Sequence, residues 1–172
     1  MAKKIALVIA HEGYDAVEYN VPKKMLEEAG YQVVTISNKL GKARATDGST
    51  TGVDALLDKI DPINFDGIVF IGGPGALTEL DNDLSYSVLQ RAVMADKLVG
   101  GICSATRILA KSGALVAKTA TGWNGDQNLP QIYNDHAVLY DDEVGVVRDG
   151  RIVTAEGATH AAEFARELME VV

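Results

Sequence analysis

One stretch of the sequence decides the fold: Leu98-Val-Gly-Gly-Ile-Cys-Ser-Ala-Thr-Arg-Ile-Leu-Ala-Lys-Ser-Gly113. Its first five residues form a short apolar run with two glycines, which is typical of a strand buried on both faces. Apolar residues then recur at helical spacing as far as Leu109, and Gly113 suits the residue that ends a helix. The stretch therefore predicts a strand followed at once by a helix, with Cys103 at the junction.

Cys103 is the only cysteine in the chain, and its predicted position favours a nucleophile. Unpaired backbone N–H groups and the helix dipole at the start of a helix stabilise a thiolate and lower the thiol pKa. The pattern Gly101-x-Cys103-x-Ala105 is also similar to the elbow that carries a nucleophile in other α/β enzymes. The alternative is a small buried side chain without a chemical role, which is common for a lone cysteine.

Composition and charge limit the class of protein. The chain has 172 residues, 47% of them hydrophobic and 23% charged, which predicts one globular domain over residues 1–172. A formal net charge of −8 argues against nucleic acid or an anionic membrane as a partner. One cysteine forms no internal disulfide, which favours the reducing cytoplasm. The apolar run Ile5–Ala10 is too short for a signal peptide, and no run approaches membrane-spanning length.

Strands and helices alternate along the chain, which predicts an α/β fold. Asp149-Gly150 lies between two strand-like segments and predicts an antiparallel hairpin, and the polar segment Lys39–Thr51 predicts a loop or small hairpin. We expect a three-layer sandwich with a mostly parallel sheet. The predicted strands are Ile5–Ala10, Tyr31–Ser37, Ile68–Ile71, Leu98–Ile102, Lys118–Thr121, Val144–Arg148 and Arg151–Thr154. The predicted helices are Val17–Ala29, Val53–Ile60, Leu84–Ala95, the one that follows Cys103 and stops at Gly113, and one from Ala161 to the C-terminus.

The first predicted helix carries an acidic residue of interest. Asp15 is its expected N-cap, and an apolar stripe at i, i+4 steps from Val17 to Ala29 is expected to face the core. Pro22 lies inside the helix and leaves the carbonyl of Glu18 unpaired, so we expect a kink at Glu18. Because Glu18 follows the carboxyl end of the first strand, it points toward the crevice where open α/β sheets bind ligands. The alternative is a surface glutamate that stabilises the helix dipole.

A glycine-rich loop, Gly72-Gly73-Pro74-Gly75-Ala76, directly follows the strand Ile68–Ile71. It lacks the glycine spacing of the phosphate-binding loops of nucleotide-binding proteins. Glycines in this position allow backbone N–H groups to face a ligand, as an oxyanion site requires.

Five motifs occur in order along the chain: Ile5-Ala-Leu-Val-Ile-Ala10, Gly13-Tyr-Asp-Ala-Val-Glu18 with Pro22, Phe65-Asp-Gly-Ile-Val-Phe-Ile-Gly-Gly73, Ile102-Cys-Ser-Ala105 and Glu163-Phe-Ala165. Together they resemble the DJ-1/PfpI superfamily of small cytosolic cysteine proteins, which includes glyoxalases, deglycases, isonitrile hydratases and proteins once named intracellular proteases. The resemblance covers nearly the whole chain and implies a flavodoxin-like core, activity without a cofactor and a homodimer.

The resemblance also implies roles for four residues. Cys103 corresponds to the nucleophile, and Glu18 to the acid whose carboxyl proton bonds the thiolate. Gly73 and Ser104 would supply the backbone N–H groups of the oxyanion site. The chain departs from many relatives in two places: Ser104 stands where they have a histidine after the cysteine, and Gly122-Trp123 stands where others carry a histidine in the next loop.

The remaining candidates for the pocket are Trp123, His160, His11 and Tyr14. His160 opens the last predicted helix near a loop that lines the site in relatives, and His11 directly follows the first strand. A lone histidine is more often a surface or capping residue, and His136 lies in a polar segment. The cysteine and the three histidines show no spacing typical of metal ligands, so we expect no metal site.

These features predict a cysteine enzyme that acts without a cofactor on small reactive carbonyl compounds, such as methylglyoxal or its early adducts, with a role in protection against stress. Two alternatives remain open, a redox sensor that works by oxidation of Cys103 and an enzyme that hydrates isonitriles. The missing histidine disfavours a peptidase, because amide cleavage must protonate a poor leaving group.

Overall fold

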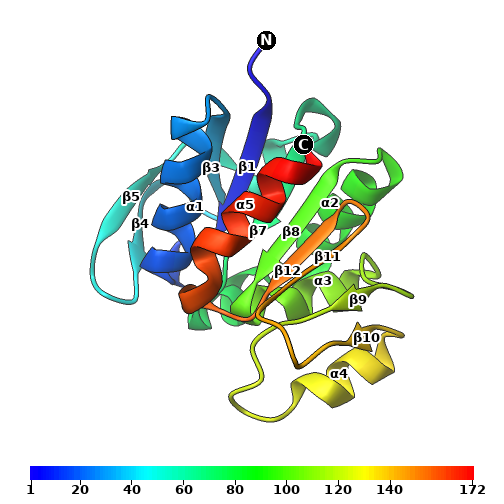
Figure 1. The fold of residues 1–172 in the computed structure, drawn as a ribbon. Helices are drawn as coiled ribbons and strands as arrows, with labels where there is room; N and C mark the ends of the chain where they lie inside the picture. Colours follow the sequence, from blue (N-terminus) through cyan, green and yellow to red (C-terminus); the bar gives the residue numbers. More distant parts are fainter.

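The computed structural model describes residues 1–172 and has three layers, with a central sheet between two pairs of helices (Figure 1). The sheet has seven strands in the order β11-β12-β8-β7-β1-β3-β6, all parallel to their neighbours except β11. This confirms the predicted α/β sandwich with its mostly parallel sheet. The strands are β1 (Lys4–Ile9), β3 (Gln32–Ser37), β6 (Ala55–Leu56), β7 (Gly67–Phe70), β8 (Leu98–Ile102), β11 (Val146–Asp149) and β12 (Ile152–Ala155).

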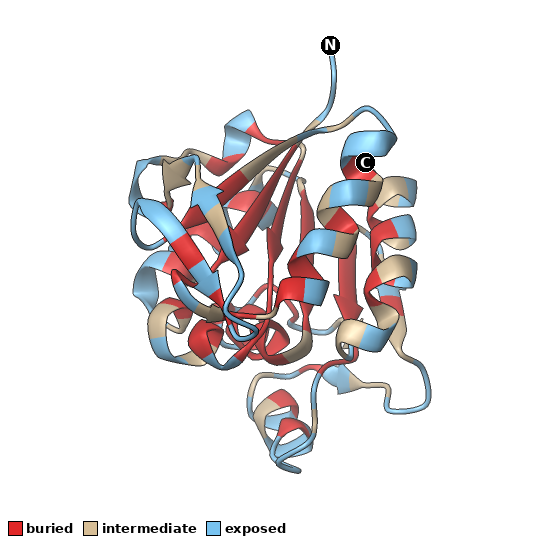
Figure 2. Cartoon of the chain, turned by 90° about the vertical axis from the view of Figure 1, so that its left-hand side faces the viewer, coloured by how far each residue is buried: buried red, intermediate tan, exposed pale blue.

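The helices α1 (Ala16–Glu28) and α5 (Ala161–Val171) cover one face of the sheet, and α2 (Asp83–Met94) and α3 (Thr106–Ser112) cover the other. Alternate residues of β1 divide between the two cores, since Ile5 packs on the α1 side and Ala6 on the α2 side. In Figure 2 the central strands are buried throughout, while the helices are buried only on the side that faces the sheet. The apolar runs of the sequence therefore form the central sheet, which is the middle of the three layers.

Two glycines of β8 let the helices approach the sheet closely. A Cβ at Gly100 would lie 2.9 Å from Leu168 of α5, and a Cβ at Gly101 would lie 2.7 Å from Leu109 of α3. Both distances are shorter than a normal carbon–carbon contact. β8, the strand that leads to Cys103, thus packs closely against α5 on one face and α3 on the other.

Two small sheets and a short helix lie outside the central sheet. The first sheet holds β2 (Glu12–Tyr14), β4 (Gly41–Ala45) and β5 (Thr50–Val53), and the second holds β9 (Thr119–Ala120) and β10 (Leu139–Tyr140). The antiparallel pairs β4–β5 and β11–β12 confirm the two predicted hairpins. Helix α4 (Leu129–Asp135) was not expected, although its apolar residues Leu129, Ile132 and Tyr133 have helical spacing, because the segment is only seven residues long.

The predicted helix Val53–Ile60 is wrong. Val53 ends β5, Ala55–Leu56 is an edge strand of the central sheet, and Leu57–Lys59 is a single 3-10 turn. Asp54 binds β3 through two hydrogen bonds of 2.8 Å, in which its carboxylate accepts from Thr35 N and its own N–H donates to Thr35 O. Pairing with β3 therefore overrides the weak helical pattern.

The buried face of α1 also differs from the expected stripe. Val17 is 49% exposed, whereas Glu18, Tyr19 and Leu26 are buried. The stripe predicted from Val17 to Ala29 is wrong because the helix turns an acidic side chain, Glu18, toward the sheet. No helix in the structure is both long enough and apolar enough to cross a membrane.

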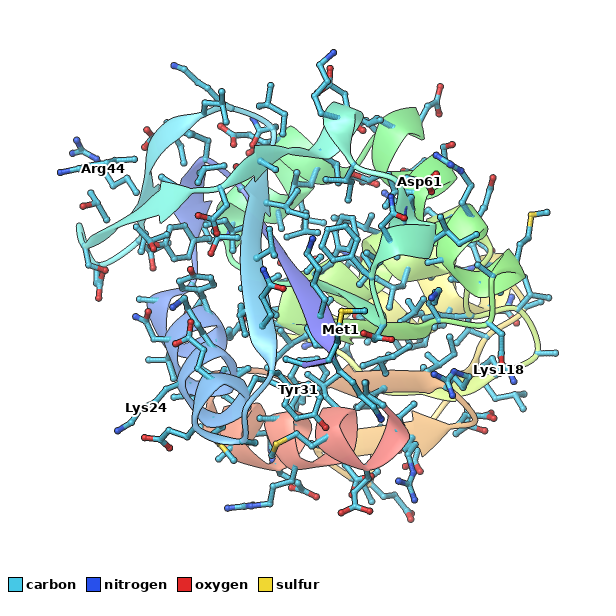
Figure 3. All side chains as sticks on the ribbon, turned by 90° about the horizontal axis from the view of Figure 1, so that it is seen from above. Met1, Lys24, Tyr31, Arg44, Asp61 and Lys118 are labelled. Carbon is cyan, nitrogen blue, oxygen red and sulfur yellow. The ribbon has the colours of Figure 1, made fainter.

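Figure 3 looks down on the end of the molecule at which the parallel strands begin, with Met1 and Tyr31 near the viewer. The carboxyl ends of β1, β7 and β8 lie at the opposite end. The loops that follow these strands meet there, as is usual for ligand sites in open α/β sheets.

Candidate active site

Cys103 stands at a strained elbow between β8 and α3. Its φ is +59°, in the left-handed region that residues with a Cβ rarely adopt, and a single 3-10 turn, Cys103–Ala105, leads into the helix. Such a conformation costs about 1–3 kcal/mol and is held by the surrounding structure. The predicted nucleophile elbow is therefore confirmed in its backbone geometry.

Glu18 reaches the elbow from the first turn of α1. The Asp15 carboxylate caps this helix by accepting the N–H groups of Val17 and Glu18 at 2.9 and 3.0 Å, which confirms the predicted N-cap. Glu18 is only 2% exposed, its Oε2 accepts the Gly72 N–H at 2.9 Å, and its carboxyl lies beside the Cys103 side chain at Gly72. The prediction that Glu18 faces the crevice rather than solvent is confirmed.

Gly72 lies against both Glu18 and Cys103, and its lack of a side chain leaves room for these two residues to meet. A Cβ at this position would lie 2.5 Å from Glu18 Oε2 and 2.8 Å from the Cys103 Cβ. Any side chain there would displace one of the two groups.

Burial raises the pKa of Glu18 from 4.5 to about 8. The negative charge of Asp15 adds to this effect, while the hydrogen bonds from Cys103 and Gly72 oppose it. Glu18 is therefore mostly protonated at neutral pH and has a proton to donate.

Burial also raises the pKa of the Cys103 thiol, followed by the charge of Glu18 and their mutual hydrogen bond, while the Ser104 N–H acts in the opposite direction. The expectation of a thiol pKa below its free value is therefore wrong, because the effect of the helix start is smaller than the cost of burying a thiolate beside a carboxyl group. The pair releases one proton near pH 8, and repulsion between two anions opposes release of the second.

Gly73 and Ser104, the expected oxyanion residues, lie on the two loops that meet at the cysteine. The Ser104 hydroxyl donates to the Gly73 carbonyl oxygen at 2.8 Å. Gly73 has a φ of +108°, and a Cβ there would lie 2.5 Å from Gly13 O, so only glycine fits. The structure thus brings both residues to Cys103.

A cavity of about 560 Å³ opens beside the cysteine. Of the residues singled out from the sequence, Cys103, Glu18, Gly73, Ser104 and Trp123 line it. The lining residues are Asp15, Glu18, Gly73, Pro74, Leu77, Thr78, Cys103, Ser104, Trp123 and Asp126.

The other three pocket candidates do not line this cavity. His11 is buried beside Glu12, with 3.6 Å between its Nδ1 and the Glu12 carboxylate. Tyr14 is buried and packs edge-on against Tyr19. Their predicted place in the pocket is wrong because Tyr14 belongs to β2, which pairs with β4, and the carbonyl of His11, just before β2, accepts the Arg44 N–H of β4.

His160 is also placed outside the cavity. Its ring lies between the carboxylates of Glu156 and Glu163, at 3.5 and 3.8 Å, and it sits so close to Gly145 that a Cβ there would lie 2.1 Å from it. The histidine therefore packs on the loop before β11, and no histidine lines the cavity.

Sequence reasoning missed the pair Arg107–Asp126. Arg107, four residues after Cys103 on α3, is 5% exposed and binds both carboxylate oxygens of Asp126 at 2.6 and 2.9 Å. The same guanidinium donates to Trp123 O at 3.3 Å and lies 5.1 Å from the centre of the Trp123 ring. An arginine at i+4 from the nucleophile and an aspartate three residues after the tryptophan were the available signals. Together they hold the loop that forms one wall of the cavity.

Comparisons with known proteins agree with this geometry. A model of the DJ-1/PfpI family matches residues 3–171. The dj-1beta protein of Drosophila melanogaster is 29% identical over 97% of this chain and 88% of its own length, and a deglycase of Pyrococcus horikoshii is 27% identical over 98% of each. The crystal structure of a ThiJ/PfpI domain protein from Brachyspira murdochii has a TM-score of 0.92 at 30% identity, over 99% of this chain and 96% of that one. The family model spans the chain almost from end to end, and the chain belongs to the DJ-1/PfpI family.

Proposed function

We propose that this protein is a cysteine enzyme that acts without a cofactor on small reactive carbonyl compounds such as methylglyoxal or its early adducts. One observation carries the proposal: the side chains of Cys103 and Glu18 meet beside Gly72 and together line a cavity of about 560 Å³. A thiolate adds readily to an aldehyde, and the neighbouring acid supplies the proton that the product needs.

The reactive form is the minor tautomer of the singly deprotonated pair, in which Glu18 keeps its proton and Cys103 is the thiolate. The sulfur forms a bond to the aldehyde carbon, and the carbonyl electron pair moves to the oxygen. The N–H groups of Gly73 and Ser104 hold that oxygen, and Glu18 then protonates it to give a hemithioacetal.

Glu18, now a carboxylate, serves as the base for the next step. It removes the proton from the former aldehyde carbon of methylglyoxal and delivers it to the adjacent carbon. One carbon is thereby oxidised to a thioester of Cys103 and the other is reduced to an alcohol. Water hydrolyses the thioester, releases lactate and regenerates the thiol, so the reaction needs no external oxidant or reductant.

The test follows methylglyoxal and lactate by NMR with the protein, Cys103→Ser and Glu18→Gln. We expect consumption by the parent protein and its loss in both variants, whereas Glu28→Gln, a change at an exposed residue of the same helix, retains it. Absence of consumption by the parent, or equal rates in the parent and Cys103→Ser, would overturn the proposal. An isonitrile in place of methylglyoxal tests the hydration alternative.

Redox sensing by Cys103 is the second candidate. The Glu18 carboxyl and the backbone N–H groups of Gly73 and Ser104 provide donors for oxygens added to the sulfur, and the chain has no other cysteine to form a disulfide. The raised thiol pKa lowers the thiolate fraction and so slows the reaction of Cys103 with peroxide. Addition of two oxygens at stoichiometric peroxide, seen by intact mass together with a higher melting temperature, would support the sensor.

We further propose a cytoplasmic homodimer. The family resemblance supports the dimer, and a nucleophile that must stay reduced supports the compartment. Light scattering on the purified protein tests the oligomeric state.

A further inference from the structure

The charged groups of the cavity are all acidic. Among its lining residues are the carboxyl groups of Asp15, Glu18 and Asp126, and no lysine, arginine or histidine. Glu18 is mostly neutral below its pKa of about 8, so two ionised carboxylates remain at neutral pH.

The Asp15 carboxylate acts on the reacting groups directly. The two backbone N–H groups that it caps fix it at the start of α1, on the edge of the cavity. Its negative charge contributes to the raised pKa of both Glu18 and Cys103.

Arg107 is the candidate for a compensating charge, but its two terminal nitrogens are already bound and its Nε is buried without a partner. Nη1 and Nη2 bind the two oxygens of Asp126, and Nη2 also binds Trp123 O. Arg107 does not line the cavity, so Asp126 lies between the guanidinium and any ligand. A substrate carboxylate or phosphate therefore finds no cation to bind.

We propose that the pocket selects by charge: Asp15 and Asp126 admit neutral and cationic carbonyl compounds to Cys103 and exclude those with a carboxylate or phosphate. Aldehydes and α-oxoaldehydes, or their adducts on amines and guanidines, fit this class, whereas α-oxo acids and sugar phosphates do not. The choice of substrate rests on the proposed function, but the charge selection at Cys103 is testable without turnover.

The experiment uses three methanethiosulfonates that carry a trimethylammonium, a methyl or a sulfonate group. In each, Cys103 forms a disulfide with the sulfenyl sulfur, methanesulfinate leaves and the thiol proton goes to buffer; the single cysteine makes intact mass a complete readout. For each thiol, the rate with the trimethylammonium reagent is divided by the rate with the sulfonate reagent. At pH 7 and low salt we expect this ratio to be about tenfold higher for Cys103 than for 2-mercaptoethanol. The excess of the Cys103 ratio over the 2-mercaptoethanol ratio should shrink in about 0.5 M salt, because salt screens the charges.

Variants locate the effect. Asp15→Asn keeps the helix cap and should lower the ratio severalfold, and the ratio cancels any change in thiol reactivity. Asp126→Ala exposes the Arg107 guanidinium and should speed the anionic reagent about tenfold; Asp126→Asn keeps the loop contacts and should act in the same direction. Asp96→Asn is the matched control, because the Asp96 side chain is 90% exposed and precedes β8 at the far end of that strand.

The outcomes separate this inference from the proposed function. A parent ratio equal to that of 2-mercaptoethanol, or one that neither Asp15→Asn nor Asp126→Asn lowers more than Asp96→Asn does, overturns the charge selection. A high ratio that both variants lower supports it even where methylglyoxal is not consumed. If methylglyoxal is consumed, a kcat/KM for glyoxylate at least about tenfold lower supports the same selection during turnover.

Discussion

The Ser104 hydroxyl donates a hydrogen bond of 2.8 Å to the carbonyl oxygen of Gly73. The two residues follow different strands of the sheet, β8 and β7, and each carries one of the backbone N–H groups proposed to hold the substrate oxygen. This bond therefore fixes the spacing between the two donors before any substrate arrives, which is the arrangement that makes an oxyanion site effective.

We expect Ser104→Ala to lower carbonyl turnover about tenfold, mainly in kcat, while unfolding free energy falls by only about 1 kcal/mol. Steady-state kinetics and chemical denaturation measure the two effects. Ser112→Ala is the control, because its buried hydroxyl donates a similar bond to Leu109 O at 2.7 Å on the far end of α3. Equal turnover in Ser104→Ala and the parent would show that the bond does not position the donors.

The second prediction concerns stability against pH. The folded-state pKa of Glu18 is about 8, above its ordinary 4.5, so the fold favours the protonated form. The resulting stabilisation is complete below pH 4.5 and is lost as pH rises to about 8, by at most about 1.4 kcal/mol per pH unit. Relative to Glu18→Gln, whose amide does not titrate, the parent should lose stability steadily across this window.

Denaturation in urea at several pH values measures that difference. Glu28→Gln provides the control, because Glu28 is exposed and pairs loosely with Lys24 at 3.8 Å. The same pH-dependent difference from the parent in both variants, or no pH-dependent difference between the parent and Glu18→Gln, would show that Glu18 is not buried as a neutral acid.

The third prediction concerns the reactivity of Cys103. Since the reactive form is the pair after loss of one proton, the rate of alkylation by iodoacetamide should rise about tenfold per pH unit and level off near pH 8. In Glu18→Gln the pH midpoint of the alkylation rate should move away from 8, because this variant has no carboxyl proton to release. A plateau already present at pH 6 would mean that the thiol pKa is lowered, as the helix start alone predicts.

The fourth prediction concerns Gly72. Gly72→Ala places a methyl group against Glu18 Oε2 and the Cys103 Cβ, so we expect turnover to fall about a hundredfold and the pH dependence of alkylation to change. Gly52→Ala, where nothing lies within 4 Å of the new Cβ, should leave both unchanged. Circular dichroism checks that Gly72→Ala folds; a folded variant with parental turnover contradicts the assigned geometry.

The sequence predicted the architecture because each central strand is buried on both faces and reads as a continuous apolar run, as in Ile5–Ala10. It failed where tertiary pairing decided the structure: Asp54 binds β3 and prevents a helix at Val53–Ile60. The prediction that the apolar stripe from Val17 faces the core was wrong, because α1 buries the carboxyl of Glu18 instead.

The candidate site was predicted in part. Cys103, Glu18, Gly73 and Ser104 follow strand ends or begin a helix, positions that the order of elements places together. The sequence predicted a lowered thiol pKa, whereas burial in the structure raises it. The sequence could not show this, because desolvation depends on how deeply the side chains of Cys103 and Glu18 are buried. Arg107 and Asp126 belong to segments that only the folded loop brings together, so neither residue stood out.

The close packing at Gly100 also bears on how the chain is made. β8 pairs with β12, and Gly100 faces Leu168 and Phe164 of α5, so the strand that leads to the nucleophile depends on segments that are synthesised well after it. Until Ile152–Val171 has been synthesised, β8 is an uncovered edge next to β7. Contacts between segments so distant in sequence form late and slowly, so the nascent chain carries a completed sulfur site only after Ile152–Val171 has been synthesised.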